Sequence, residues 1–232
     1  MEKETQTERK FSFYKAPVTN VNPYMEITLD KVYQLITGHW LKNKTIQLRQ
    51  IENSNTHREF KARSFPFVTF SGTFTHRKED ALKNHSGYLV LDFDHIDTPH
   101  QLKLQLLKDK YFETELLFTS PGGYGVKWVI SIDVTSEYNH GQWFDAISNY
   151  IQNIHKIEVD KSGRDVSRVC FLCFDQDAFL HPKHGNMILQ WPSEIYLVDR
   201  KKFNPAKWLE EQKPSFKTIS ETMDKNLTRI QY

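Results

Sequence analysis

The chain has 232 residues, of which 38% are hydrophobic and 13% aromatic, enough for one large or two small domains with a real core. Lysine and arginine outnumber the acidic residues by only 31 to 29, so any affinity for nucleic acid must come from local patches. No apolar run approaches the roughly 20 residues that span a bilayer, and the N-terminus lacks a signal-like pattern, so we expect a cytoplasmic protein with no membrane partner.

The N-terminal part of the chain predicts a leader, a helix and a strand. Residues 1–10 are polar and charged and predict a disordered leader, with ordered chain beginning near Phe11. From Thr28 to about Leu41 apolar residues recur at helical spacing, and Gly38 is expected to end or weaken this helix. Residues 65–70 predict a strand, whose proline suits a sheet edge or a strand start.

Residues 86–95 carry the most informative pattern, a buried strand that ends in two carboxylates. Asp92 and Asp94 are one residue apart, and because side chains alternate across a strand, both emerge on one face, where they can share a divalent cation. Burying one unpaired carboxylate costs several kcal/mol, so the pair must lie at a solvated strand end or be neutralised by metal. A strand that runs out into an acidic loop remains the alternative.

A helix and a hairpin follow. Residues 98–101 combine a threonine cap, a proline in the first helical position and a glutamine, which predicts a helix to about Lys110. Strands at 114–119 and 126–132 flank a glycine-rich turn at 120–125. Lys127 interrupts the second apolar strand, and glycines let backbone amides approach closely, so phosphate is a plausible partner for this segment. A simple hairpin turn and a surface lysine remain the alternatives.

A second acidic cluster follows a predicted core helix at 136–154. It contains Glu158, Asp160 and Asp165, and Asp160 is the natural third ligand for a site that needs several carboxylates. Asp165 is the other candidate, although aspartate in such a turn typically caps backbone amides. Arg168 offers a planar fork for phosphate oxygens, or a salt bridge to Asp165.

The C-terminal third holds a superficial zinc pattern and a change in composition. Cys170 and Cys173 are followed by His181 and His184, but strand residues three apart point to opposite faces, so we expect core cysteines in a reducing compartment. A strand is expected at 168–174. Residues 191–232 contain three prolines and predict a C-terminal appendage or linker after a domain at 11–190. The alternation of elements indicates an α+β protein.

Taken in order, three motifs resemble those of the archaeo-eukaryotic primase-polymerase superfamily. They are an acid-x-acid strand end at 91–94, a small-residue turn leading into a strand at 120–127, and a hydrophobic-aspartate step at 159–160. Residues 65–74, 86–94 and 165–171 are similar to landmarks of the branch found as the N-terminal module of virulence-associated protein E-type proteins in Bacteroides and mobile elements. The resemblance spans about residues 11–190.

The resemblance implies a primase-polymerase-like fold, with mixed sheets, flanking helices and an RRM-like catalytic half. It implies a nucleotidyltransferase that makes or extends primers on a single-stranded DNA template from nucleoside triphosphates, for a mobile element, with a replicative helicase as a further partner. Asp92, Asp94 and Asp160 would hold two Mg²⁺ or Mn²⁺ ions. The implied substrate-binding residues are Ser120, Gly122, Gly123, Gly125, Lys127 and Arg168.

One departure from the superfamily concerns the second motif. Most members have histidine where this chain has Lys127, a permanent cation rather than a titratable ring. Phosphate binding survives this change on physical grounds, whereas catalytic competence is put in doubt. Two alternatives stay open: a metal-dependent nuclease, because two-metal carboxylate sites serve nucleases equally well, and a nucleic-acid-binding replication module that has lost catalysis with the histidine.

Overall fold

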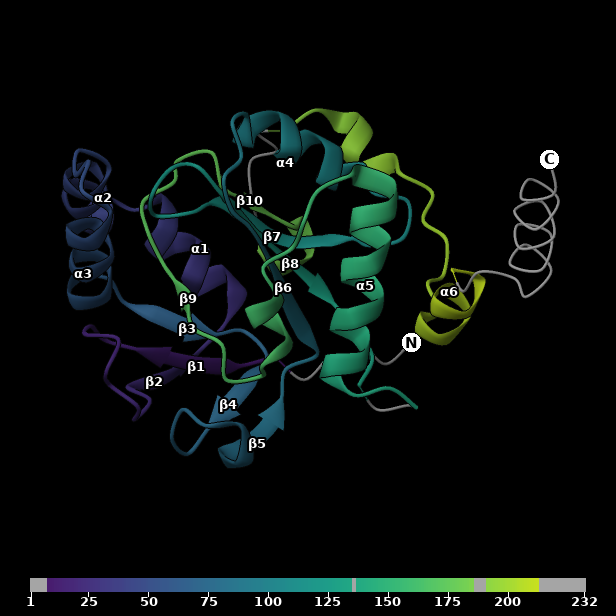
Figure 1. Cartoon of the computed structure of the whole chain (residues 1–232), viewed down its shortest axis with the longest axis horizontal. Coiled ribbons are helices and arrows are strands. Elements are labelled where there is room, and N and C mark those ends of the chain that lie inside the picture. Colours follow the sequence, from purple (N-terminus) through teal and green to yellow (C-terminus); the bar gives the residue numbers. More distant parts are fainter. Residues whose placement is uncertain (1–7, 135–136, 186–190, 213–232) are drawn as a thin grey trace, which may run out of the picture.

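The computed structural model describes residues 8–134, 137–185 and 191–212, so most of the expected leader lies outside the described residues. In these ranges six α-helices and three sheets form an α+β protein, as predicted (Figure 1). Every strand pair in the described part of the chain is antiparallel, so the mixed sheets implied by the resemblance, with parallel as well as antiparallel pairs, are not found there. None of the helices described is long and apolar enough to cross a membrane.

The first sheet is built mainly from the N-terminal part of the chain. Its order is β2-β1-β3-β9, with β1 at Phe11–Tyr14, β2 at Met25–Ile27, β3 at Phe67–Thr69 and β9 at Cys170–Phe171. Helix α1 (Leu29–Thr37) buries an apolar stripe and ends before Gly38, as predicted. The strand expected at 168–174 is only two residues long, because after Phe171 the chain leaves β3.

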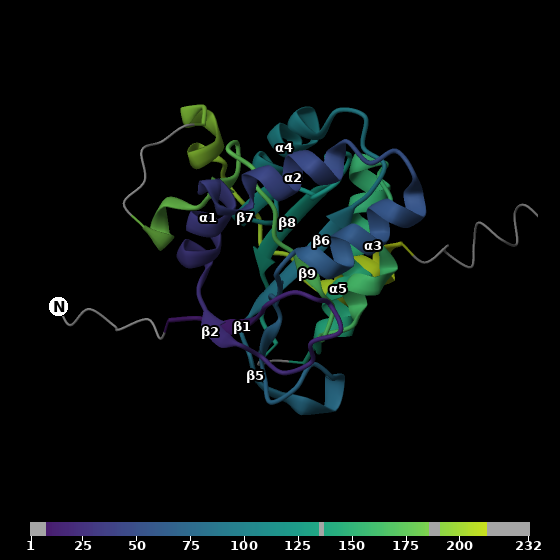
Figure 2. The ribbon, with the colours of Figure 1, turned by 90° about the vertical axis from the view of Figure 1, so that its left-hand side faces the viewer.

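Two helices form a hairpin beside this sheet. Helix α2 spans Lys42–Arg49 and helix α3 spans Ser54–Ser64. The side chain of Asn53 caps α3 by accepting hydrogen bonds from the backbone N–H groups of Asn55 and Thr56. Figure 2 turns this hairpin toward the viewer.

The central sheet has the order β10-β7-β8-β6. Its bounds are β6 at Tyr88–Phe93, β7 at Thr114–Thr119, β8 at Val126–Ser131 and β10 at Phe179–Leu180. The predicted hairpin of β7 and β8 is confirmed. A separate two-stranded sheet joins β4 (Gly72–Phe74) to β5 (Leu82–His85).

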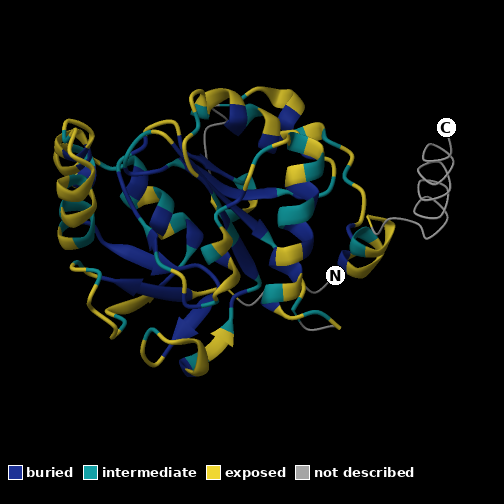
Figure 3. Cartoon of the chain, viewed as in Figure 1, coloured by how far each residue is buried: buried dark blue, intermediate teal, exposed yellow. Residues whose placement is uncertain are grey.

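The two faces of the central sheet pack into two different cores. On one face, Leu89, Leu91 and Phe93 of β6 pack with residues of α4 (Pro99–Leu107) and α5 (His140–His155). On the other face, Tyr88 and Val90 pack with α1 and the first sheet. The strands are therefore buried on both sides, as the dark colour of β6, β7 and β8 shows in Figure 3. This sandwich explains the near-continuous apolar sequences of these strands.

Residues 191–212 are packed against the core and do not form a free linker. Ile195 and Phe203 are buried in the cluster that contains α5, and Trp208 of α6 (Pro205–Glu211) lies against the same cluster. The aromatic ring of Phe203 lies 4.8 Å from that of Phe112, centroid to centroid. The expected appendage is thus part of the packed body up to Gln212, because its aromatic side chains complete this core, and residues 213–232 lie outside the described part.

Candidate functional site

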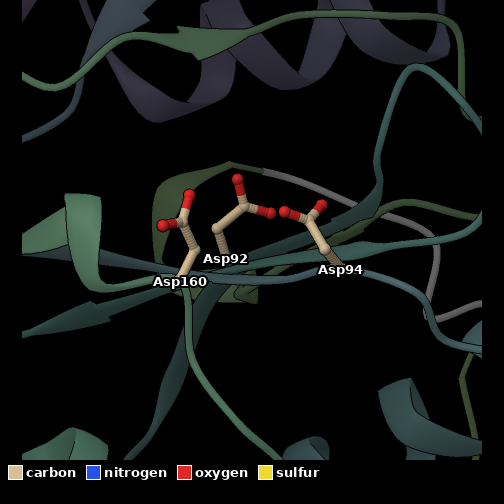
Figure 4. Close-up of side chains that lie close together, drawn as sticks. All are labelled: Asp92, Asp94 and Asp160. Atoms are coloured by element: carbon tan, nitrogen blue, oxygen red, sulfur yellow. The ribbon is translucent and has the colours of Figure 1, made fainter. Parts of the chain in front are cut away.

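The acid pair lies at the end of the edge strand β6. Asp92 continues the face of Tyr88 and Val90, and Asp94 follows one residue after the strand ends. The Asp92 side chain is 18% exposed, whereas Asp94 is an exposed residue. The strand's alternation, read from the sequence, therefore placed both carboxylates correctly on one face (Figure 4).

Asp160 reaches this pair because the chain after α5 runs along the free edge of β6. The backbone N–H of Asp160 donates to the carbonyl oxygen of Asp92 at 2.9 Å, and the neighbouring Val159 is buried in the core. Asp92, Asp94 and Asp160 each offer a carboxylate oxygen, and these oxygens lie within 4.8 Å of one another. Three carboxylates at this separation can share one cation, given metal–oxygen bonds of about 2.1 Å.

The donor set fits Mg²⁺ or Mn²⁺. Oδ1 of Asp92 is buried and has no hydrogen-bond partner, which leaves a carboxylate oxygen free for a ligand. Asp94 forms no ion pair or hydrogen bond through its side chain with any described residue. Carboxylate oxygens are the ligands that these hard cations prefer.

Asp160 is held ionised and oriented by its own turn. Its carboxylate accepts hydrogen bonds from the backbone N–H of Ser162 at 3.0 Å and from the Ser162 hydroxyl at 2.6 Å. Burial raises the pKa of Asp160, but the Ser162 hydrogen bonds, followed by the charges of Arg168 and Lys127, outweigh that effect and keep the pKa below its ordinary value. The carboxylate is therefore ready to bind a cation at neutral pH.

Lys127 is an interior residue and not a surface lysine. The register places it directly across from Asp92 on β6 and from Phe118 on β7. Its residue exposure is 8%, and its ammonium donates a hydrogen bond to Oδ2 of Asp92 in an ion pair. Burial lowers the pKa of Lys127, and the positive charges of Lys61 and Arg168 act in the same direction.

The structure separates the roles of Asp165 and Arg168. The guanidinium of Arg168 donates to Asp160 at 3.1 Å, and no ion pair joins it to Asp165 in the described chain. Asp165 accepts from the backbone N–H of Ser167 at 2.8 Å and from its hydroxyl, which is the capping role expected of such an aspartate. Glu158 is exposed and is not part of the acid cluster. Asp160 is therefore the third acid.

The glycine loop is shaped by close packing. Gly123 has a φ of 91°, and a Cβ at Gly125 would lie 2.6 Å from the carbonyl oxygen of Phe93, so neither position accepts a side chain without strain. The Gly123 N–H donates to the Ser120 carbonyl at 3.0 Å, which commits this amide to the turn. Ser120 and Gly122 line the cleft above the acid cluster, whereas Gly123 and Gly125 shape the loop.

The acid cluster lies in a cleft of about 770 Å³ between the central sheet and the α2–α3 hairpin. Its lining also includes Glu52 and six basic residues that none of the sequence motifs identifies as site residues: Arg49, His57, Arg58, Lys61, Arg77 and His95. A signal was present, because His57 and Lys61 are four residues apart and follow the capping residue Asn53, which predicts one face of a helix.

The cysteines and histidines do not form a zinc site. Cys170 and Cys173 are both buried and free, and burial raises the pKa of the Cys173 thiol to about 12. His184 lies against Glu115, with Nε2 2.5 Å from the carboxylate. Within the described residues, the cluster at Asp92, Asp94 and Asp160 is the single group of three or more metal-ligating side chains. The expectation of core cysteines is confirmed.

Residues 59–180 match the family model described as BT4734-like, N-terminal domain. The matched segment contains the three aspartates, the glycine loop, Lys127 and Arg168. No curated protein and no solved structure matches the chain.

Proposed function

The chain belongs to the BT4734-like N-terminal domain family, and we propose that it is a primase-polymerase-type nucleotidyltransferase that makes or extends primers on single-stranded DNA for a mobile element. The observation that carries this proposal is the convergence of Asp92, Asp94 and Asp160 at the floor of a cleft whose walls are basic. Clustered carboxylates beside cations suit a metal-bound, polyanionic substrate.

The order of elements around the site also supports the proposal. The chain runs β6, α4, β7, β8, α5 and then residues 157–160, and these residues return to the free edge of β6 through the Asp160–Asp92 backbone hydrogen bond. Across the sheet the order is β6, β8, β7 and β10, and residues 157–160 lie beside the free edge of β6 without forming a strand. Strands β6 and β7, joined through α4 with β8 between them, have the arrangement of a split βαβ unit, which supports the RRM-like catalytic half that the proposal expects.

In the proposed mechanism, Asp92, Asp94 and Asp160 would hold two Mg²⁺ or Mn²⁺ ions. When bound, such ions activate the attacking 3′-hydroxyl and neutralise the triphosphate and the departing pyrophosphate. The remaining task of the protein is positioning and charge stabilisation. Lys127 orients Asp92 through their ion pair, Arg168 and Ser162 orient Asp160, and the β7–β8 loop shapes the cleft floor.

The sharpest test replaces Asp94 with asparagine. Because Asp94 is exposed and makes no contact that stabilises the fold, Asp94→Asn should reduce primer synthesis and extension by on the order of 10³-fold without lowering the melting temperature. Asp97→Asn is the matched control, since Asp97 is an exposed aspartate three residues further on that does not line the cleft. Reactions use single-stranded DNA, each nucleotide pool, and Mg²⁺ or Mn²⁺. Full activity of Asp94→Asn would refute the proposal, and shortening of the labelled strand without nucleotide incorporation would identify a nuclease instead.

A second candidate, a nucleic-acid-binding module without catalysis, is favoured by the contact between Lys127 and Asp92. The ammonium occupies Oδ2 of a carboxylate that the mechanism needs for metal. Isothermal titration with Mn²⁺ separates the two candidates. Binding that disappears in Asp94→Asn supports the enzyme, and absence of binding in the wild-type protein supports the module.

A further inference from the structure

Helix α3 is mostly polar and has a small packing role, through Phe60, which is partly buried against the core of the first sheet. None of its residues is fully buried, and it appears in yellow and teal throughout in Figure 3. A helix with so few apolar residues receives little stabilisation from a core. One face of α3 nevertheless lines the cleft, through His57, Arg58 and Lys61.

The cations that line the cleft fall into two groups. Lys127 and Arg168 are each paired with an aspartate of the acid cluster. Arg49 donates to the backbone carbonyls of Ser120 and Pro121, at 3.4 and 3.2 Å, and so braces the glycine loop, and Arg77 donates to the backbone carbonyl of Val18 at 2.9 Å. Lys127 and Arg168 are therefore occupied in holding the acid cluster together.

Arg58 and Lys61 are different. Neither forms an ion pair or a side-chain hydrogen bond within the part of the chain that the structure describes. The ammonium of Lys61 lies 5.6 Å from the ring centroid of Phe171, which also lines the cleft. They are three residues apart on α3, so their side chains project from the same side of the helix, roughly 5–6 Å apart at Cβ.

The charges at this wall repel one another. Burial lowers the pKa of Lys61, the charge of Asp94 opposes that effect, and the charges of Arg168 and Arg58 lower the pKa further. Cations gathered in this way, with neither side chain in an ion pair, favour the binding of a polyanion. Arg58, Lys61 and Asp94 line the same cleft, so this wall lies beside the acid cluster, where a metal-bound phosphate would be.

We infer that Arg58 and Lys61 of α3 bind the triphosphate of the incoming nucleotide, in place of Lys127 and Arg168. The inference rests on the proposed function and deepens it. It assigns the phosphate contacts to the lysine and arginine of the cleft whose side chains make no hydrogen bond or ion pair within the described residues, and it leaves Lys127 and Arg168 as positioning residues for the carboxylates. It also accounts for a mostly polar helix that lines the cleft and contributes only Phe60 to a core.

The test measures nucleotide binding directly in the full chain. A fluorescent, non-hydrolysable nucleoside triphosphate analogue is titrated with Mn²⁺ present, and a labelled single-stranded oligonucleotide is titrated separately. Arg58→Gln and Lys61→Gln should each weaken binding of the analogue about tenfold, the effect of losing one charge-assisted contact, and should change oligonucleotide binding by less than about twofold. Arg63→Gln is the matched control, because Arg63 lies on the same helix, is exposed and does not line the cleft.

The outcomes separate this inference from the proposed function. Unchanged binding of the analogue in both variants, a loss confined to the oligonucleotide, or no binding of the analogue by the wild-type protein overturns the inference. If the wild-type protein binds the analogue through Arg58 and Lys61 but forms no product with any metal, the phosphate site stands and nucleotidyl transfer fails.

Discussion

Asp92 and Glu115 are acidic residues of the same central sheet with opposite surroundings. Glu115, on β7, has a side chain that is 2% exposed and accepts hydrogen bonds from Ser131, from Lys183 at 2.9 Å and from His184 at 2.5 Å. Asp92, on β6, has one ion pair and one buried oxygen without a partner. A buried carboxylate whose oxygens are both satisfied stabilises a fold, whereas one with an unused oxygen beside other carboxylates is available for a ligand.

The largest effect that would sharpen this comparison is expected for Glu115→Gln. The substitution removes the charge that Lys183 and His184 face, and we expect the free energy of unfolding to fall by about 2–3 kcal/mol at pH 7, as measured by urea denaturation. Mn²⁺ affinity should not change, because Glu115 is not part of the acid cluster. A stable variant with weakened metal binding would show that the two regions do not differ as described.

Lys127→His should have a smaller effect than Glu115→Gln, and this effect should be a gain in metal affinity. The ammonium of Lys127 orients Asp92 but also competes with a metal ion for Oδ2; a histidine, which is neutral at pH 8, removes this competing charge, so Mn²⁺ affinity should rise about tenfold at that pH. Calorimetric titration measures this change, and Lys183→His, which alters a lysine paired with Glu115, is the control. Weaker Mn²⁺ binding in Lys127→His would show that the lysine supports the metal site.

A further prediction concerns pH. Burial raises the pKa of Glu115, but the hydrogen bonds from His184, Ser131 and Lys183 outweigh burial and bring the pKa to about 2, from an ordinary value of 4.5. Because the folded-state pKa is depressed, the stability that this carboxylate contributes is present above pH 4.5 and is lost as the pH falls toward 2. The difference in unfolding free energy between wild type and Glu115→Gln should therefore shrink across this window. A difference that stays constant from pH 7 to pH 2 would contradict this account.

The sequence predicted more of the acid cluster than of the cleft around it. Asp92 and Asp94 follow from strand alternation alone, and Val159-Asp160 was identified by its order relative to the other motifs. The sequence leaves the partner of Arg168 open between phosphate and Asp165, whereas in the structure Arg168 forms an ion pair with Asp160. Arg58 and Lys61 were missed because α3 lacks the apolar stripe by which a helix is usually recognised.

The sequence by itself determined the local elements: the β6 strand with two carboxylates on one face, the β7–β8 hairpin with its glycine turn, and the amphipathic helices α1 and α5. Only the tertiary structure decided that Asp160 lies at the edge of β6 and that Lys127 lies opposite Asp92 on the neighbouring strand β8. It also decided that the cations of α3 line the same cleft as these residues. The reason is physical. Backbone periodicity sets the face on which a side chain emerges, whereas the neighbours of that face depend on strand register and on how both cores are buried at once.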